Sequence, residues 1–411
     1  MIVVECFGRD PVDNIATCLS LRPNKLMLIG EAEKLSQSVE RYRDFIGQRQ
    51  LPIAVDSRNV NLDDVTEVVS ILSDIVETGE PCVIDLEGGD GNALAAAGIV
   101  YERYKDIYPV TLQSTDAMTG AAVDCDGDGK VAHLYSPNIS VDELIKLYGG
   151  SSKYPTLPNA GLADINPIWM ASISDADQWN RRVTALLEIE KYSRESASTL
   201  QKNIDFSVVR LHIRDYAEKR QLFDRLINDL EACGVISIAS RAEASFRYRY
   251  TSQFACRCMR KQGNVLEHKT LLEARALQQN GQAVFHDCLM SVSIDWDGVE
   301  HEYVYGGTKD TSNEIDVLLM HGMTPVFISC KNGIVKDEEL YKLNTVAEKF
   351  GGERVRKALI ATACYTDDLD KRMALQQRAE DMGICFEADA ATFSDADWQD
   401  FLLRVLDERF D

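Results

Sequence analysis

The stretch NEIDVLLMHGMTPVFISCK, residues 313–331, contains two apolar runs that are joined by the short segment HGMTP (321–325). Apolar runs of this length, bounded by Gly and Pro, predict two strands that form a hairpin. Asp316 begins the first strand and Lys331 ends the second, so antiparallel pairing brings a carboxylate and an ammonium to the same rim. The segment therefore predicts a sheet that presents paired opposite charges at one end.

The residues at this rim suit metal-assisted phosphodiester hydrolysis. Glu314 shares a strand face with Asp316, and Ser329 shares one with Lys331, because side chains alternate along a strand. Hard oxygen ligands bind Mg²⁺ or Mn²⁺, and a cation beside the attacking water stabilises the transition state. We expect Asp316 to bind the metal, Lys331 to position or activate the water, and Glu267 to add a carboxylate from the start of a helix. A surface salt bridge is the alternative interpretation.

Residues 1–150 alternate apolar strands with helical patterns. The expected strands include IVVECF (2–7), KLMLIG (25–30), LPIAVD (51–56) and CVIDLE (82–87), and helical patterns lie between them. Apolar strands separated by helices are typical of a parallel, doubly wound α/β sheet. We therefore predict a Rossmann-like N-terminal domain.

Two polar turns follow the first and fourth predicted strands, where a parallel sheet binds its ligands. The residues expected to line a ligand pocket there are Gly8, Arg9, Asp10, Asn14, Glu87, Gly88, Gly89, Asp90, Gly91 and Asn92. Glycines let the backbone approach a ligand, and a helix N-terminus presents free N–H groups to an anion. Leu94 stands where a dinucleotide-binding G-x-G-x-x-G pattern needs its last glycine, which disfavours a nicotinamide-dependent oxidoreductase. A tight turn with a capping Asp or Asn is the alternative.

The middle of the chain separates two α/β regions. The segment GGSSKYPTLPNAGLADINP (149–167) is rich in Gly, Ser and Pro and predicts a linker. A helical block follows to about Cys233, and GVISIASRAEASFRYRYTS (234–252) then predicts a hairpin, an arrangement that resembles a winged helix. We expect three parts: a ligand-binding domain at 1–150, a connector at 151–250 and a second α/β domain at 251–411.

Charge is distributed unevenly over the 411 residues. The net charge is -22, which excludes non-specific binding of nucleic acid over the whole surface. Residues 241–357, however, hold 16 basic and 16 acidic residues and are neutral. There Arg247 and Arg249 alternate with aromatic residues, and with Arg257 and Lys261 they could follow a phosphate backbone. An amphipathic strand with a solvated basic face is the alternative.

Composition limits the cellular setting. Hydrophobic residues make up 45% of the chain and charged residues 27%, as in ordinary globular proteins. The eleven cysteines are scattered without a C-x-x-C pair, which favours reduced thiols and disfavours a structural zinc site. The N-terminus does not resemble a signal peptide, and no apolar run approaches the roughly 20 residues of a membrane span. We therefore expect a cytoplasmic protein that does not contact a membrane.

The C-terminal part resembles a PD-(D/E)XK nuclease. Leu266-Glu267 matches the first helix motif, Asp316 the central aspartate, and Ser329-x-Lys331 the final tripeptide. The resemblance implies that the backbone carbonyl of Cys330 also binds the metal. Ser329 departs from the family because a carboxylate usually stands there, so the second acidic contact is expected from Glu267 or Glu314.

The N-terminal part resembles the CRISPR-associated Rossmann-fold (CARF) domain. The matching residues are Gly8-Arg9-Asp10 and the motif Asp85-x-Glu87-Gly88-Gly89-Asp90. The order of the two domains is similar to that of the stand-alone CARF nucleases of type III CRISPR defence. This resemblance implies a homodimer that binds a cyclic oligoadenylate, with cyclic tetra-adenylate expected, and is thereby activated allosterically.

The implied activity is Mn²⁺- or Mg²⁺-dependent cleavage of single-stranded RNA or DNA, or nicking of duplex DNA, in antiviral defence. The alternative is a non-catalytic, nucleotide-sensing regulator whose degenerate nuclease fold only binds nucleic acid. Ser329 leaves this alternative open.

Overall fold

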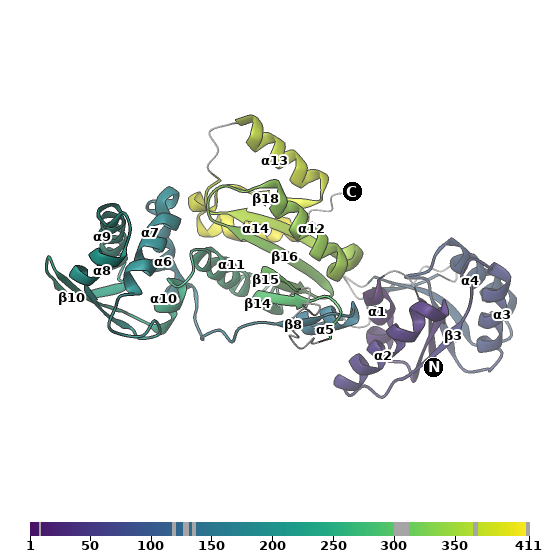
Figure 1. The fold of residues 1–411 in the computed structure, drawn as a ribbon. Coiled ribbons are helices and arrows are strands. Elements are labelled where there is room, and N and C mark those ends of the chain that lie inside the picture. The colour runs from purple at the N-terminus through teal and green to yellow at the C-terminus, as the bar shows by residue number, and fades with distance from the viewer. Residues whose placement is uncertain are drawn as a thin grey trace, which may run out of the picture.

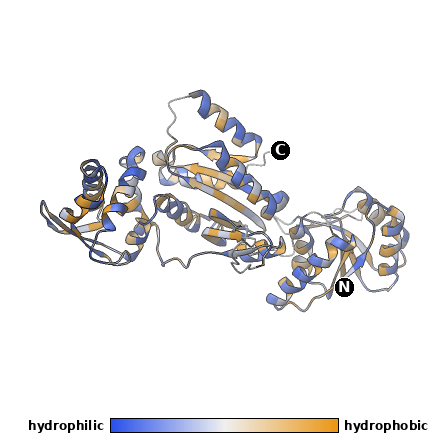
Figure 2. Cartoon of the chain, in the orientation of Figure 1, coloured by the Kyte–Doolittle hydropathy of each residue, from blue (hydrophilic) through white to orange (hydrophobic). Residues whose placement is uncertain are grey.

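The computed structural model describes residues 1–7, 10–116, 121–125, 131–133, 137–299, 312–364 and 369–407. Figure 1 shows three units in a row: an N-terminal sheet with its helices, a central sheet built from the C-terminal half, and a smaller helical unit from the middle of the chain. In Figure 2 the strands of both larger sheets are mainly hydrophobic and the outer helical faces mainly hydrophilic. None of the helices in these ranges combines the length and apolar composition that a membrane crossing needs.

The N-terminal unit is a seven-stranded sheet with the order β3-β2-β1-β4-β5-β6-β7. Its strands are β1 (Ile2–Cys6), β2 (Lys25–Gly30), β3 (Ala54–Asn59), β4 (Cys82–Asp85), β5 (Val110–Asp116), β6 (Ala121–Asp124) and β7 (Val131–His133), and its helices are α1 (Pro11–Leu21), α2 (Ala32–Gln48), α3 (Val65–Val76) and α4 (Gly91–Tyr104). Strands β1 to β5 pair in parallel, whereas β6 and β7 pair antiparallel. The strand order reverses between β1 and β4, which leaves a crevice beyond their carboxyl ends.

Capping side chains fix where the helices at this crevice begin. Asp10 is the N-cap of α1 and accepts a hydrogen bond from the Val12 N–H, and Pro11 occupies the first helical position. Asp90 is the N-cap of α4 and accepts from Asn92 and Ala93. Both helix N-termini therefore lie at the carboxyl ends of β1 and β4.

The central unit is a six-stranded sheet with the order β18-β17-β16-β15-β14-β8. Its strands are β8 (Ser151–Lys153), β14 (Asp287–Asp295), β15 (Ser312–His321), β16 (Thr324–Lys331), β17 (Arg356–Ala361) and β18 (Ile384–Glu387), and its helices are α11 (Asn264–Ala276), α12 (Asp337–Gly351), α13 (Leu369–Asp381) and α14 (Asp395–Asp407). Strands β14, β15 and β16 are antiparallel neighbours, whereas β16, β17 and β18 run in parallel.

Helix α5 (Val141–Leu147) joins the N-terminal and central units. One buried apolar cluster contains Leu144 and Leu147 of α5, Val3 of β1 and Phe327 of β16. Because this cluster is continuous, the two sheets share a hydrophobic core at their junction.

The third unit has the order helix, strand, helix, helix, strand, strand that defines a winged helix. These elements are α7 (Trp179–Glu190), β9 (Gln201–Asp205), α8 (Phe206–His212), α9 (Tyr216–Ala232), β10 (Ile236–Arg241) and β11 (Ser245–Tyr250). Helices α6 (Leu162–Ile173) and α10 (Gln253–Cys258) flank it, and β11 is the middle strand of its three-stranded sheet. The predicted winged-helix-like connector is thus present in the fold.

The structure confirms the predicted α/β class but corrects several local predictions. Strand β3 begins three residues later than the predicted strand at 51–56, and β9 lies inside a block for which we predicted only helices. β9 carries no apolar alternation of its own and forms because it pairs with β11. Strand β8, inside the predicted linker, pairs with β14 of the central sheet. The domain boundaries themselves stay a prediction.

Candidate active site

Asp316 lies where the backbone pairing of β15 is interrupted on both sides. The pairing of β15 with β14 skips Ser291, which has a left-handed φ of 49°, and the pairing of β15 with β16 ends at Val317. The Asp316 carboxylate replaces the missing backbone acceptor: its Oδ2 accepts the Cys330 N–H at 2.7 Å and the Ser329 hydroxyl at 3.1 Å. These two bonds fix the orientation of the carboxylate.

Lys331 lies beside Asp316, as the hairpin predicts. Its Nζ is 3.5 Å from Asp316 Oδ2 and 3.1 Å from Glu339 Oε2 on α12. Burial by itself lowers the pKa of Lys331, but the charges of Asp316 and Glu339 outweigh it and hold that pKa above its ordinary value. Lys331 is therefore an ammonium at neutral pH and suits charge stabilisation better than proton abstraction.

Glu267 approaches the same rim from α11 and is 2% exposed. Its Oε2 accepts a hydrogen bond from Ser291 at 3.3 Å, so the irregular backbone of β14 aims a hydroxyl at this carboxylate. Burial, followed by the charge of Asp316, raises the pKa of Glu267 to about 7. The structure thus brings together Glu267 and Asp316, which are far apart in the sequence.

Lys261, which was expected to contact nucleic acid, lies beside these carboxylates. Its Nζ is 3.7 Å from Glu267 Oε1 and 3.4 Å from Glu314 Oε1. Arg257, which was also expected to contact nucleic acid, donates a hydrogen bond to the Thr156 carbonyl. Lys261 therefore provides a positive charge that balances the acidic rim.

The rim offers few protein ligands to a divalent cation. Within the described ranges no group of three or more His, Cys, Asp and Glu side chains could hold a metal ion. Asp316 and Glu267 supply two carboxylates, and Mg²⁺ commonly uses one or two with water completing its shell. The thiol of Cys330 is buried against Thr270, so Cys330 can reach a cation only through its backbone carbonyl.

The glycine-rich turn before α4 and the N-terminus of α1 lie at the crevice between β1 and β4. Asp90 caps α4, and Glu87 accepts a hydrogen bond from Ser114 of β5 at 2.8 Å. Asn14 is fully buried: its amide donates to the Cys6 carbonyl, and its oxygen accepts from Tyr42. Gly8 and Arg9 lie outside the described residues. Asn14 thus has a structural role, while the glycine-rich turn at 88–91 borders the crevice.

A buried pair of carboxyl groups below this crevice was missed in the sequence. Glu5 of β1 and Asp85 of β4 are register partners and are almost completely buried. Burial, then the charge of Asp85, raises the pKa of Glu5 well above its ordinary value, and burial raises the pKa of Asp85 to about 7. The Thr17 hydroxyl donates to Asp85. An acidic residue inside each of the apolar runs IVVEC and CVID was the available signal.

We predict that Asp85→Asn reduces the pH dependence of stability. Because the pKa of Asp85 is raised in the folded state, its contribution to the free energy of unfolding is fully present below the ordinary pKa of 3.8. This contribution is lost as the pH rises through about 7, by up to about 4 kcal/mol. Chemical denaturation between pH 5 and 8 should therefore show a falling unfolding free energy for the wild type and a flatter profile for the variant. The exposed Asp74→Asn serves as the control, and equal slopes in all three proteins would contradict the prediction.

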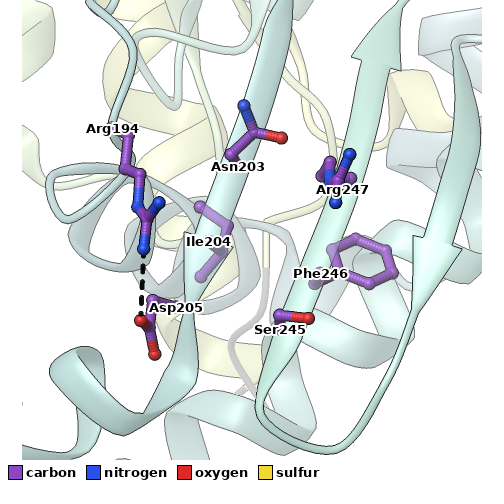
Figure 3. A pocket seen from close by; sticks show the side chains of 7 residues that line it. All are labelled: Arg194, Asn203, Ile204, Asp205, Ser245, Phe246 and Arg247. Carbon is purple, nitrogen blue, oxygen red and sulfur yellow. Dashed lines mark ion pairs between the residues drawn. The ribbon is translucent and has the colours of Figure 1, made fainter.

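A hollow lies on the sheet of the winged-helix unit. Figure 3 shows the side chains that line it, from β9, β11 and the segment before β9: Arg194, Asn203, Ile204, Asp205, Ser245, Phe246 and Arg247. Arg194 Nη2 lies 3.7 Å from Asp205 Oδ2. The exposed residues of β11 are Ser245, Arg247 and Arg249, whereas its aromatic residues are buried. The basic face predicted from the alternating sequence is therefore open to solvent.

These units define a class of architecture. A CARF-like parallel sheet is followed by a winged-helix unit and by a mixed sheet in which an aspartate and a lysine from neighbouring strands converge, as in PD-(D/E)XK folds. No protein-family model and no curated protein matches the sequence.

Solved structures nevertheless match over nearly the whole chain. Protein VC1899 from Vibrio cholerae has a TM-score of 0.70 at 15% identity and covers 98% of this chain and 97% of its own. Can2 from Sulfobacillus thermosulfidooxidans, in complex with cyclic tetra-adenylate, has a TM-score of 0.67 at 15% identity and covers 99% of each chain. The fold is that of these proteins, and the CARF resemblance seen in the sequence is confirmed at the level of fold.

Proposed function

We propose that this protein is a metal-dependent nuclease that a cyclic oligoadenylate activates, with cyclic tetra-adenylate as the expected activator. The observation that carries the proposal is the convergence of Asp316, Lys331 and Glu267 at one rim of the central sheet. The shared fold with Can2, which was solved with cyclic tetra-adenylate, supports the choice of activator. We further propose a cytoplasmic homodimer that acts in type III CRISPR antiviral defence, because a two-fold axis suits a ring of like nucleotides.

The residues at the rim have separable tasks. Asp316 and Glu267 would hold Mn²⁺ or Mg²⁺, with the Cys330 carbonyl as a further ligand. When bound, the cation would polarise the phosphodiester and acidify a water. Ser329 and the Cys330 N–H orient Asp316, and Lys331 would offset the negative charge that develops on the phosphate. Glu314, half exposed and paired with Lys261, would act at the periphery of the site.

A non-catalytic regulator is the second candidate. The observation that favours it is Ser329, whose hydroxyl stands where the resembling nucleases usually carry a carboxylate and is bound to Asp316. A site with fewer acidic ligands binds a cation more weakly, and a protein that only senses nucleotides and binds nucleic acid needs no cation.

One experiment separates the two candidates. Purified protein is incubated with plasmid DNA or single-stranded RNA, with and without Mn²⁺ and cyclic tetra-adenylate. The nuclease predicts cleavage only when both are present. Measurable binding of cyclic tetra-adenylate without cleavage would favour the regulator, and absence of both would reject the proposed activator.

We propose that the exposed face of β11 guides the nucleic-acid substrate. Arg247 and Arg249 point outward from the same strand, and a single strand carries phosphates that two such guanidinium groups can neutralise. The residues from 151 to 262 contain 17 basic and 13 acidic residues, which makes this part of an acidic chain net positive. Charge complementarity therefore favours this surface over the rest of the molecule.

We predict that replacing Arg247 and Arg249 together by alanine weakens binding of single-stranded substrate and makes it less dependent on salt. The slope of log affinity against log salt should decrease by about 1.4, because two phosphate contacts are lost. Fluorescence anisotropy with a labelled oligonucleotide at several KCl concentrations measures this slope. A double alanine variant at Lys371 and Arg372, exposed on α13, matches the charge change, and an equal decrease there would argue for a non-specific charge effect.

A further inference from the structure

Helix α12 runs from the candidate active site to the N-terminal unit. It spans Asp337–Gly351, about 22 Å at the usual rise of an α-helix. Its first turn carries Glu339, which lies 3.1 Å from Lys331 Nζ and 3.0 Å from Lys342 Nζ. Hydrogen bonds from both lysines outweigh the effect of burial and hold the pKa of Glu339 below its ordinary value, so it is a carboxylate. The position of α12 therefore decides how the Lys331 ammonium is shared between Glu339 and Asp316.

The opposite end of α12 contacts the N-terminus of α1. The short 3₁₀ helix η2 (Gly352–Arg354) continues directly from α12. Its Glu353 N–H donates to Asp10 Oδ2 at 3.1 Å, and Arg354 forms an ion pair with Asp13 in the first turn of α1. Asp10 also accepts the Tyr148 hydroxyl at 2.6 Å. One carboxylate at the crevice is thus bonded to the end of α12.

Gly352 allows this close approach. Its φ is 62°, and a Cβ atom there would collide with the Tyr148 hydroxyl and with Asp10 Oδ2. Only glycine combines the left-handed backbone with the lack of a side chain that this contact requires. The junction is therefore tightly fitted.

Packing makes α12 suitable for carrying a displacement. Its buried side chains Leu340, Leu343, Val346 and Phe350 belong to the same apolar cluster as Phe327 of β16. A helix packed in this way shifts as a unit, because closely packed interiors deform little. A movement of Asp10 that displaces η2 would consequently also displace Glu339.

We propose that α12 couples the N-terminus of α1 to Lys331, with Arg354, Glu353 and Tyr148 as the coupling contacts and Glu339 as the positioning residue for the lysine. This inference rests on the proposed function and names the route by which occupation of the crevice regulates the active site. The coupling requires that α12 has two positions and that Asp10 moves with it. A ligand that binds more tightly to the crevice in one of these positions would shift the equilibrium toward that position.

Amide hydrogen exchange on the full chain tests the coupling without requiring any activity. The variants are Arg354→Ala and the milder Tyr148→Phe, and Lys349→Ala is the matched control because this exposed lysine lies at the same end of α12. Both coupling variants should increase exchange in residues 331–343, about one helix length away, whereas the control should not. Exchange that changes only near residues 350–357 in both variants would overturn the proposal.

Activity then supplies a second readout. Arg354→Ala should still bind cyclic tetra-adenylate, but the ratio of cleavage rates with and without it should fall about tenfold. The binding of Mn²⁺ should likewise no longer alter the affinity for cyclic tetra-adenylate, since coupling between two sites is reciprocal. The coupling would be overturned if the variant kept the wild-type ratio of cleavage rates and if Mn²⁺ still altered its affinity for cyclic tetra-adenylate. Absence of binding and cleavage in the wild type would instead reject the proposed function, and hydrogen exchange would still decide the inference.

Discussion

Lys331→Ala should abolish activator-dependent cleavage, with a loss of rate of about a thousandfold. The ammonium is held 3.5 Å from Asp316, and its raised pKa keeps it charged, so alanine removes the cation that stabilises the developing negative charge. Binding of cyclic tetra-adenylate should be unchanged. Initial rates on single-stranded substrate with saturating Mn²⁺ and activator measure the effect.

Two further variants make this result specific. Lys336→Ala removes an exposed lysine five residues further along the chain and should retain the wild-type rate. Asp316→Asn can still accept the Cys330 N–H and should remain folded, yet it should be as inactive as Lys331→Ala because it loses a carboxylate ligand. If Lys331→Ala and Asp316→Asn both cleaved at the wild-type rate, the observed rim could not be the active site.

Glu267→Gln should weaken Mn²⁺ binding by about a hundredfold, since even residues that only support a metal ligand contribute tenfold or more. The pKa of Glu267 is about 7 in the metal-free protein, and a carboxylate must lose its proton to bind a cation. Wild-type affinity should therefore increase from pH 6 to pH 8 and then level off, with a proton released on binding. Calorimetry in buffers of different ionisation enthalpy measures both quantities.

The same raised pKa predicts that the stability of the metal-free protein changes with pH in the opposite direction to the affinity for Mn²⁺. Its stability should decrease as the pH rises through about 7, because the folded state then loses the protonated form that burial favours. Glu267→Gln should make this decrease smaller, with the contribution of Asp85 remaining, and should flatten the pH dependence of metal binding. The exposed Glu338→Gln is the control, and a wild-type affinity that does not change between pH 6 and pH 8 would show that Glu267 is not a ligand.

Local sequence was sufficient for the pairing of Asp316 with Lys331. The two residues stand on consecutive strands joined by a short turn, so their proximity follows from hairpin register. The parallel N-terminal sheet was predictable for a similar reason, because each strand and helix shows its own hydrophobic period. The strand order, which creates the crevice between β1 and β4, was expected only from the fold class.

Contacts between distant segments could not be predicted from local sequence patterns. Asn14 was expected at a ligand surface, but it is buried by Tyr42 from α2. Lys261 was expected to contact nucleic acid, which stays a prediction, but its position beside Glu314 and Glu267 was not expected. Strand β9 lacks a strand pattern and depends on its partner β11.

The sequence by itself determined the fold class, the order of the units and the central pair of charges, since these depend on periodicity and on residues close together in the chain. Glu267 was expected beside this pair from the sequence. Only the tertiary structure decided that Glu339 also approaches it, and that Asp10 is bonded to the end of α12. Such contacts join residues up to 343 positions apart. They arise from the burial of whole helices against sheets, which depends on the summed packing of many side chains rather than on any local pattern.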